Sequence, residues 1–165
     1  MLFRVQDWLF DVDVDATVAY SEHLYSEHCE CGYCRNYYAT VDSKYPALKP
    51  FFSQFGVHVE VPVDFLPVEP TLCIVSYALC GTIVEEGREF VEMNGFSLTV
   101  QRQEQLDYTL SCQQPYFVLT TGYLELPWVL DEDMDEVVSP ANEPACLERM
   151  YRKLLGEAAT DGIQS

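Results

Sequence analysis

The sequence predicts an α+β fold: a single domain in which an antiparallel sheet is flanked by helices. Apolar residues recur at helical spacing in segments before position 56 and again near the C-terminus. Between positions 57 and 126 they alternate or form longer β-type runs. This order differs from the regular strand–helix–strand alternation of a parallel sheet. With 165 residues, 48% of them hydrophobic, the chain is long enough for one domain with its own core.

The N-terminal segment predicts a hairpin followed by a helix. In residues 1–14 apolar side chains alternate with aspartates, which is typical of strands, and the turn is expected near Gln6 and Asp7. Asp15 is then expected to cap a helical segment that runs through Tyr20 and Leu24.

Two further helices are predicted before position 56. The first has its apolar face at i, i+3, i+4 and i+7 and should end before Tyr45-Pro46. Its face consists of Cys34, Tyr37, Tyr38 and Val41. The second helix has the same spacing and should end at Gly56, a residue suited to the left-handed conformation after a helix. Its apolar face consists of Leu48, Phe51, Phe52 and Phe55.

The middle of the chain predicts strands. Four valines at every second position from Val57 to Val63 indicate a half-buried strand. Three later stretches read as further strands, TLCIVSYALCGTIV, EFVEMNGFSLTVQ and YFVLTTGYLEL, and Asn94-Gly95 favours a tight hairpin turn. The C-terminal part predicts a helix through Leu147 and Leu154, so the domain should span residues 1–156, with a frayed tail at 157–165.

The charge of the chain narrows the classes of partner. Twenty-seven acidic and nine basic residues give a formal net charge of −18. Such a field repels phosphate backbones and anionic lipids, so neither direct nucleic-acid binding nor membrane binding is expected. The N-terminus lacks the pattern of a signal peptide, and no apolar run reaches the roughly 20 residues that span a bilayer. We therefore expect a cytoplasmic protein; a protein partner and the oligomeric state stay open.

The segment from Tyr20 to Cys34, YSEHLYSEHCECGYC, is the densest cluster of reactive side chains. Cys29, Cys31 and Cys34 could bind zinc, with His28 or His23 as a fourth ligand, because zinc prefers tetrahedral sets of thiolates and imidazoles. Structural zinc sites usually join two ligand pairs across a longer loop, whereas these ligands are crowded into one stretch.

Two other interpretations of this cluster are open. Cys31-Gly-Tyr-Cys34 is similar to the Cys-x-x-Cys motif of thioredoxin-like oxidoreductases, which would make Cys31 and Cys34 a redox pair. No apolar strand precedes Cys31, unlike in that family. Alternatively, Cys34 is a small core residue and the others belong to an ordinary helix start. The remaining four cysteines are expected to be core thiols: Cys73, Cys80, Cys112 and Cys146.

Most of the chain also resembles an uncharacterised family of small acidic bacterial proteins. The resemblance rests on HCECGYCRNYYATVDSKYPALKPFFSQFG, with its Cys-x-x-Cys-Arg-Asn segment, and on VEPTLCIVSY and LPWVLDEDMDEVVSPANEP. It implies no activity or cofactor. We expect a soluble, non-catalytic binding or accessory protein. The alternatives are a zinc-binding or thiol-redox protein that uses the cysteine cluster, and an acidic nucleic-acid mimic that binds a basic partner protein.

Overall fold

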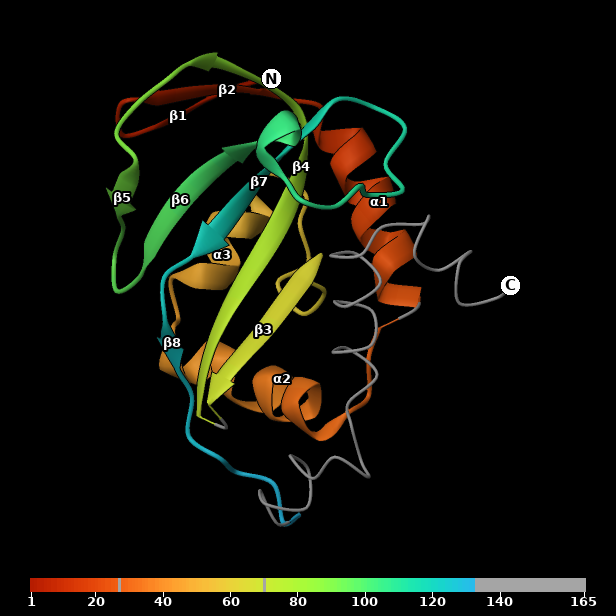
Figure 1. Ribbon diagram of the computed structural model, residues 1–165, viewed down its shortest axis with the longest axis vertical. Coiled ribbons are helices and arrows are strands. Elements are labelled where there is room, and N and C mark those ends of the chain that lie inside the picture. Colours follow the sequence, from red (N-terminus) through yellow and green to blue (C-terminus); the bar gives the residue numbers. More distant parts are fainter. Residues whose placement is uncertain (27, 70, 133–165) are drawn as a thin grey trace.

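The predicted α+β class is confirmed: helices flank an antiparallel sheet (Figure 1). The computed structural model describes residues 1–26, 28–69 and 71–132, and within them the sheet has eight strands. The helices are α1 (Val14–Ser26), α2 (Gly32–Lys44) and α3 (Leu48–Ser53), with a short 3-10 helix η1 (Gln103–Gln105). The strands are β1 (Leu2–Val5), β2 (Trp8–Val12), β3 (Asp64–Glu69), β4 (Leu72–Glu85), β5 (Phe90–Glu92), β6 (Ser97–Arg102), β7 (Tyr116–Thr121) and β8 (Leu124–Glu125).

Strand β4 is the centre of the sheet. The strand order is β1-β2-β4-β7-β6-β5, and β3 and β8 also pair with β4. Along one edge of β4, β3 pairs with its first half and β2 with its last residues. Along the other edge, β8 and then β7 pair with it. All these pairings are antiparallel, as the sequence predicts.

The N-terminal hairpin is confirmed, and the cap of the first helix lies two residues earlier than predicted, at Asp13 rather than Asp15. Gln6 takes a positive φ of 52° at the turn between β1 and β2. The amide of Ala16 donates to Asp13 Oδ1 over 3.0 Å, so Asp13 caps α1. The prediction of Asp15 as the cap is wrong, because Asp15 already lies in the first turn. In the first turn the Asp15 carboxylate still interacts favourably with the positive end of the helix dipole.

Helix α2 confirms the predicted apolar face and end, whereas α3 ends at Ser53, before the predicted Gly56, so Phe55 of the predicted face lies in the turn that follows. The C-terminal cap of α2 is Tyr45, whose amide donates to the Val41 carbonyl. The chain leaves α3 through Gly56, which has a φ of +89°. A Cβ atom at Gly56 would lie 2.6 Å from Val18 Cγ2 of α1, so the position requires glycine for space as well as for conformation.

The two faces of β4 belong to two apolar clusters. Val75, Tyr77 and Leu79 are fully buried in the larger cluster beneath α2 and α3, and the Phe52 ring lies 4.2 Å from the Tyr77 ring. Ala78 lies in a smaller cluster that is packed by α1 and by the loop 106–115. The sheet is therefore covered on both faces at the level of β4.

The predicted strand from Val57 to Val63 is wrong. Its four valines are buried and alternate with less buried residues, but they form no ladder. The amide of Val61 donates to His58 in a turn, Pro62 has no amide hydrogen, and β3 begins only at Asp64. Alternating burial here comes from packing under the sheet rather than from strand pairing.

Other predicted strands are confirmed with interruptions. The hairpin of β5 and β6 turns at Gly95, whose φ is +90°. The predicted strand YFVLTTGYLEL is divided into β7 and β8 at Gly122. The predicted helix through Leu147 and Leu154, the domain end at 156 and the tail 157–165 lie outside the described residues.

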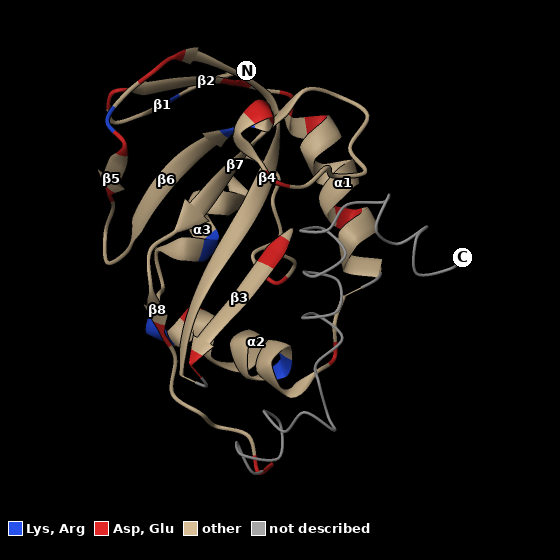
Figure 2. Cartoon of the chain, in the orientation of Figure 1, with Lys and Arg blue, Asp and Glu red and all other residues tan. Residues whose placement is uncertain are grey.

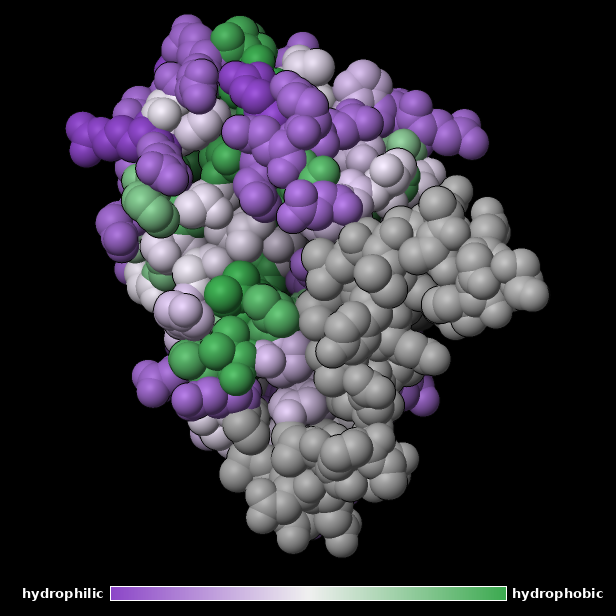
Figure 3. Space-filling model, in the orientation of Figure 1, coloured by the Kyte–Doolittle hydropathy of each residue, from purple (hydrophilic) through white to green (hydrophobic). Residues whose placement is uncertain are grey.

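Apolar side chains gather on one part of the surface over β3 and β4 (Figure 3). The exposed large apolar residues of β3 are Leu66 and Val68, with 39% and 46% of their surface exposed. Among the described residues, no helix combines the length and the apolar character needed to cross a membrane.

We expect Tyr77→Phe to lower the free energy of unfolding by about 1 kcal/mol, the usual cost of a buried hydrogen bond. The hydroxyls of Tyr37 and Tyr77 contact each other, and each lies within 3.0 Å of the Val59 carbonyl. They have two protons for three contacts, so either hydroxyl alone can still satisfy that buried carbonyl.

The double variant Tyr37→Phe/Tyr77→Phe removes both donors and should cost about 2–4 kcal/mol, more than the sum of the single variants. Urea denaturation measures each value. The matched control is Tyr123→Phe, since Tyr123 is 65% exposed and should show no effect. Strictly additive single and double values would contradict this interpretation of the pair.

Candidate metal centre

The three cysteines lie where α1 connects to α2. Cys29 is in the connecting loop, and Cys31 is the N-cap of α2 in an extended conformation (φ −66°, ψ 163°). Cys34 follows in the first turn of the helix. These three side chains can converge, because the residue three positions after the N-cap lies on the same face of the helix as the N-cap.

The sulfur atoms of Cys29, Cys31 and Cys34 lie within 4.8 Å of one another. A tetrahedral zinc ion with Zn–S bonds of about 2.3 Å holds its sulfurs about 3.8 Å apart. The cluster is therefore about 1 Å wider than a bound zinc requires. Cys29 and Cys34 are 7% and 5% exposed, and Cys31 is half-buried, so one edge of the cluster meets solvent.

The backbone around the cluster favours negative charge on sulfur. The amide of Cys31 donates to Cys29 Sγ over 3.4 Å. The N-terminus of α2 adds its backbone amides and the positive end of the helix dipole, which favour negative charge nearby. Three thiolates this close repel one another, however, so full ionisation requires a cation among them.

Arg35 lies beside the cluster but interacts mainly with a carboxylate. Its side chain donates to the Glu30 carbonyl over 2.8 Å and to Glu132 Oε2 over 2.6 Å. The hydrogen bond with Glu132 raises the pKa of Arg35, and the cluster residue Cys31 adds to the same direction. The guanidinium therefore ties Glu132 to the start of α2.

Tyr38 closes the inner side of the cluster. Its hydroxyl donates to the Cys29 carbonyl over 2.7 Å, which fixes the loop against α2. Burial raises the pKa of Tyr38, and the charges of Cys34, Cys29 and Cys31 raise it further. The phenol therefore remains a neutral hydrogen-bond donor. The sequence indicated Tyr38 only as part of an apolar helix face, and its role at the loop follows from the position of Cys29.

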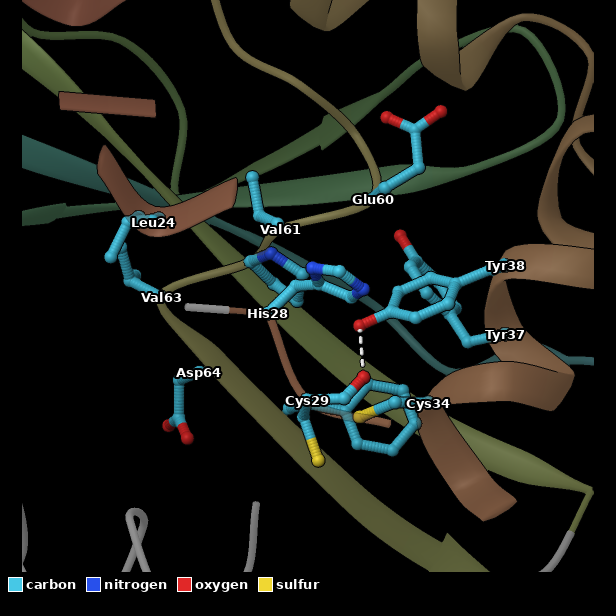
Figure 4. A pocket seen from close by; sticks show the side chains of 12 residues that line it. Leu24, His28, Cys29, Cys34, Tyr37, Tyr38, Glu60, Val61, Val63 and Asp64 are labelled. Atoms are coloured by element: carbon cyan, nitrogen blue, oxygen red, sulfur yellow. Dashed lines mark hydrogen bonds between the residues drawn. The ribbon is translucent and has the colours of Figure 1, made fainter. Parts of the chain in front are cut away.

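The two histidines predicted as ligands are placed differently. His28 Nδ1 lies 2.9 Å from the Tyr25 carbonyl, so Nδ1 carries a hydrogen, and Nε2 lies 3.6 Å from Glu30 Oε1. His28 also lines a cavity together with Cys29, Cys34 and Tyr38 (Figure 4). His23 is exposed on α1. Among the described residues, neither histidine belongs to the group whose ligand atoms lie within 4.8 Å.

The cavity beside the cluster is small. Its volume is about 40 Å³, enough for a few water molecules and far below the roughly 300–1,000 Å³ of small-molecule sites. Cys31 and Cys34 are close, as a redox pair requires, but helix α1 and a loop lead into Cys31. The thioredoxin-like arrangement, in which a buried strand leads into the motif, is absent from this part of the described chain.

Comparison of the chain with protein-family models, with curated proteins and with solved structures finds no match. The resemblance to small acidic bacterial proteins stays a prediction. The chemistry of the cluster therefore has to be inferred from its own residues.

We expect alkylation of the folded protein at pH 8 to separate the cysteines by burial. Burial raises the pKa of both Cys73 and Cys80 to about 12, so only about one thiol in ten thousand is ionised at pH 8. Cys31 and Cys112 are half-buried and should be labelled first by iodoacetamide. Peptide mass spectrometry measures the order, with urea-unfolded protein as the control in which all thiols react. Equal rates for Cys73 and Cys112 in the folded protein would contradict the assignment.

Proposed function

We propose that this protein is a non-catalytic, zinc-binding accessory protein whose metal is held by Cys29, Cys31 and Cys34. The observation that carries the proposal is the convergence of three sulfur atoms within 4.8 Å. Thiolates are soft ligands that select zinc among the common divalent ions with tetrahedral preference. Zinc would also offset the mutual repulsion of the three thiolates.

A structural role is favoured over a catalytic one by the size of the cavity. A catalytic zinc keeps an open position to which substrate has access. The space of about 40 Å³ beside Cys29 and Cys34 admits water but no organic substrate. The metal would therefore fix the connection between α1 and α2.

His28 is the described candidate for a fourth ligand. Its Nδ1 hydrogen bond to the Tyr25 carbonyl is the arrangement that usually orients a metal-binding imidazole, because it leaves Nε2 for the metal. His28 is also adjacent to Cys29 and lines the same cavity. Cys146, which the sequence predicts as a core thiol, lies outside the described residues and is the cysteine to compare with His28.

The acidic surface gives weaker support to the alternative function, a nucleic-acid mimic that binds a basic partner protein. Figure 2 shows the acidic residues of the described chain spread over strands, helices and loops rather than gathered in one stripe. Several are paired with cations, as in Arg4 with Glu85 and Arg88 with Asp7. A mimic of a phosphate backbone needs a continuous row of negative charge, which this view does not favour.

We expect about one zinc per chain in protein purified without added metal. Cys29→Ser, Cys31→Ser and Cys34→Ser should each lower zinc affinity by more than about 100-fold, because loss of a ligand exceeds the roughly 10–100-fold effect of outer-shell changes. Elemental mass spectrometry gives the content, and competition with a chromogenic chelator gives the affinity. Cys73→Ser is the matched control, since that thiol is buried in the same core as Cys29 and Cys34 but does not belong to the group whose sulfurs lie within 4.8 Å.

His28→Gln and Cys146→Ser identify the fourth ligand in the same assay, with His23→Gln as the histidine control. Loss of affinity in only one of the first two assigns the ligand. The proposal would be overturned by purified protein that contains no zinc and binds none of the divalent ions added to it. In that case, a thiol pKa well below about 8.5 at Cys31 or Cys34 would instead support the redox interpretation.

Removal of zinc should loosen the α1–α2 connection without unfolding the sheet. All three cysteines come from one six-residue stretch, and the larger apolar cluster is built mainly from strands and from α2 and α3. With a chelator we expect increased hydrogen exchange in the amides of residues 28–36 and unchanged exchange in β4 and β7. Cooperative loss of protection in β4 would show instead that the metal holds the whole domain.

A further inference from the structure

A second pair of cysteines meets on the other face of the sheet. The sulfur atoms of Cys80 and Cys112 lie 3.3 Å apart, closer than the limit within which the metal cluster gathers its sulfurs. Cys80 belongs to β4, and Cys112 lies in the loop between η1 and β7. The two residues are 32 positions apart in sequence. Neither belongs to the proposed zinc site.

The fold holds both partners of this pair in place. Cys80 pairs in register with Tyr116 of β7, four residues after Cys112. The Tyr116 hydroxyl accepts a hydrogen bond from the Leu110 amide over 3.1 Å, which folds the loop back over the sheet. The amide of Cys80 donates to Thr17 Oγ1 of α1 over 3.1 Å. The short sulfur contact therefore results from strand register and from loop anchoring on both sides.

The two thiols differ in their access to solvent. Cys80 is 1% exposed, whereas Cys112 is half-buried and its sulfur lies 3.6 Å from the Gln114 carbonyl. Burial, together with the neighbouring Cys112, raises the pKa of Cys80 to about 12. A reagent from solution therefore meets Cys112 first, and Cys80 is the buried partner behind it.

We propose that Cys80 and Cys112 form a reversible disulfide when the protein meets a low-molecular-weight disulfide such as oxidised glutathione. The pair is a modification site independent of the proposed zinc centre. An S–S bond of about 2.05 Å requires the two sulfurs to approach by about 1.2 Å. The loop that carries Cys112 can supply this movement, because Cys112 lies outside the strands.

The reaction proceeds by two thiol–disulfide exchanges. The Cys112 thiolate attacks one sulfur of oxidised glutathione, forms a mixed disulfide and releases one glutathione thiolate. Cys80 then loses its proton to solvent and attacks the Cys112 sulfur, which releases the second glutathione thiolate. Two protein thiols are oxidised to one disulfide, and one glutathione disulfide is reduced to two thiols. Conversion of Cys112 to the mixed disulfide also removes a negative charge that opposes ionisation of Cys80.

The bond would change the protein at a defined place. It would join the loop 106–115 covalently to β4 above the smaller apolar cluster, which contains Ala78, Leu110 and Tyr116. Closing a loop of this length limits the unfolded chain and raises stability against denaturation. The larger cluster on the opposite face would be unaffected.

The test uses the reduced, full-length, zinc-loaded protein and oxidised glutathione at pH 8. Acid quenching, alkylation and peptide mass spectrometry should find one Cys80–Cys112 link, with a mass about 2 Da below that of the two thiols. The urea midpoint should rise and return to its initial value with dithiothreitol. Cys80→Ser should instead accumulate a stable glutathione adduct on Cys112, and Cys112→Ser should form no link.

Cys73→Ser is the matched control, because Cys73 is on the same strand, is also buried and should leave the link unchanged. Wild-type protein that keeps glutathione on Cys112 without forming the link, or that forms the link only in urea, would overturn the proposal. This readout is obtained on wild-type protein, so it stands even where a variant fails to fold. A disulfide between cysteines of the metal cluster gives a different linked peptide in the same spectra, and it does not count as the Cys80–Cys112 link.

Discussion

The fold depends on the use of both edges of β4. Its fourteen residues pair with β3 and β2 along one edge and with β8 and β7 along the other. Every buried backbone amide and carbonyl needs a partner, so a long central strand becomes stable only when shorter strands complete its hydrogen bonding. Gly81 permits the close approach of β2, since a Cβ atom there would lie 2.1 Å from the Asp11 carbonyl oxygen. The pairing of the N-terminal hairpin with β4 therefore requires glycine at position 81.

Alternation along β4 also separates the two cysteine sites. Tyr77 faces the larger cluster and, with Tyr37 of α2, holds the Val59 carbonyl. Through Tyr37 the sheet positions α2, whose N-terminus carries the metal-binding candidates. The opposite face presents Cys80 to the loop that bears Cys112. One face of β4 therefore helps to position the first site, and the opposite face, also covered, contains the second.

Local patterns predicted the parts of the structure that depend on neighbours in sequence. The face of α2 and the hairpin at Gln6 need only a few consecutive residues, and the crowding of Cys29, Cys31 and Cys34 was visible for the same reason. The strand prediction for 57–63 was wrong because alternate burial also arises without strand pairing. Here the Val59 carbonyl accepts from the Tyr37 and Tyr77 hydroxyls instead of a strand amide. Pro62 has no amide hydrogen to donate. The contact of Cys80 with Cys112 needs the register of β4 and β7, which no local pattern contains. Cys80 therefore appeared from sequence as a separate core thiol.

The acidity of the chain is the last constraint on its chemistry. A net charge of −18 makes each added thiolate costly in an already negative field, and it attracts cations over distances of about a Debye length. At the α2 N-terminus the nearest positive side chain, Arg35, is engaged by Glu132. A divalent cation is then the group that removes the repulsion among three sulfurs most completely. At Cys80 and Cys112 only two sulfurs meet, and their oxidation to a disulfide, in which oxidised glutathione takes up the two electrons and two protons, joins them without a metal. Three sulfurs beside a helix N-terminus favour a metal, whereas two sulfurs between a strand and a loop favour a covalent bond.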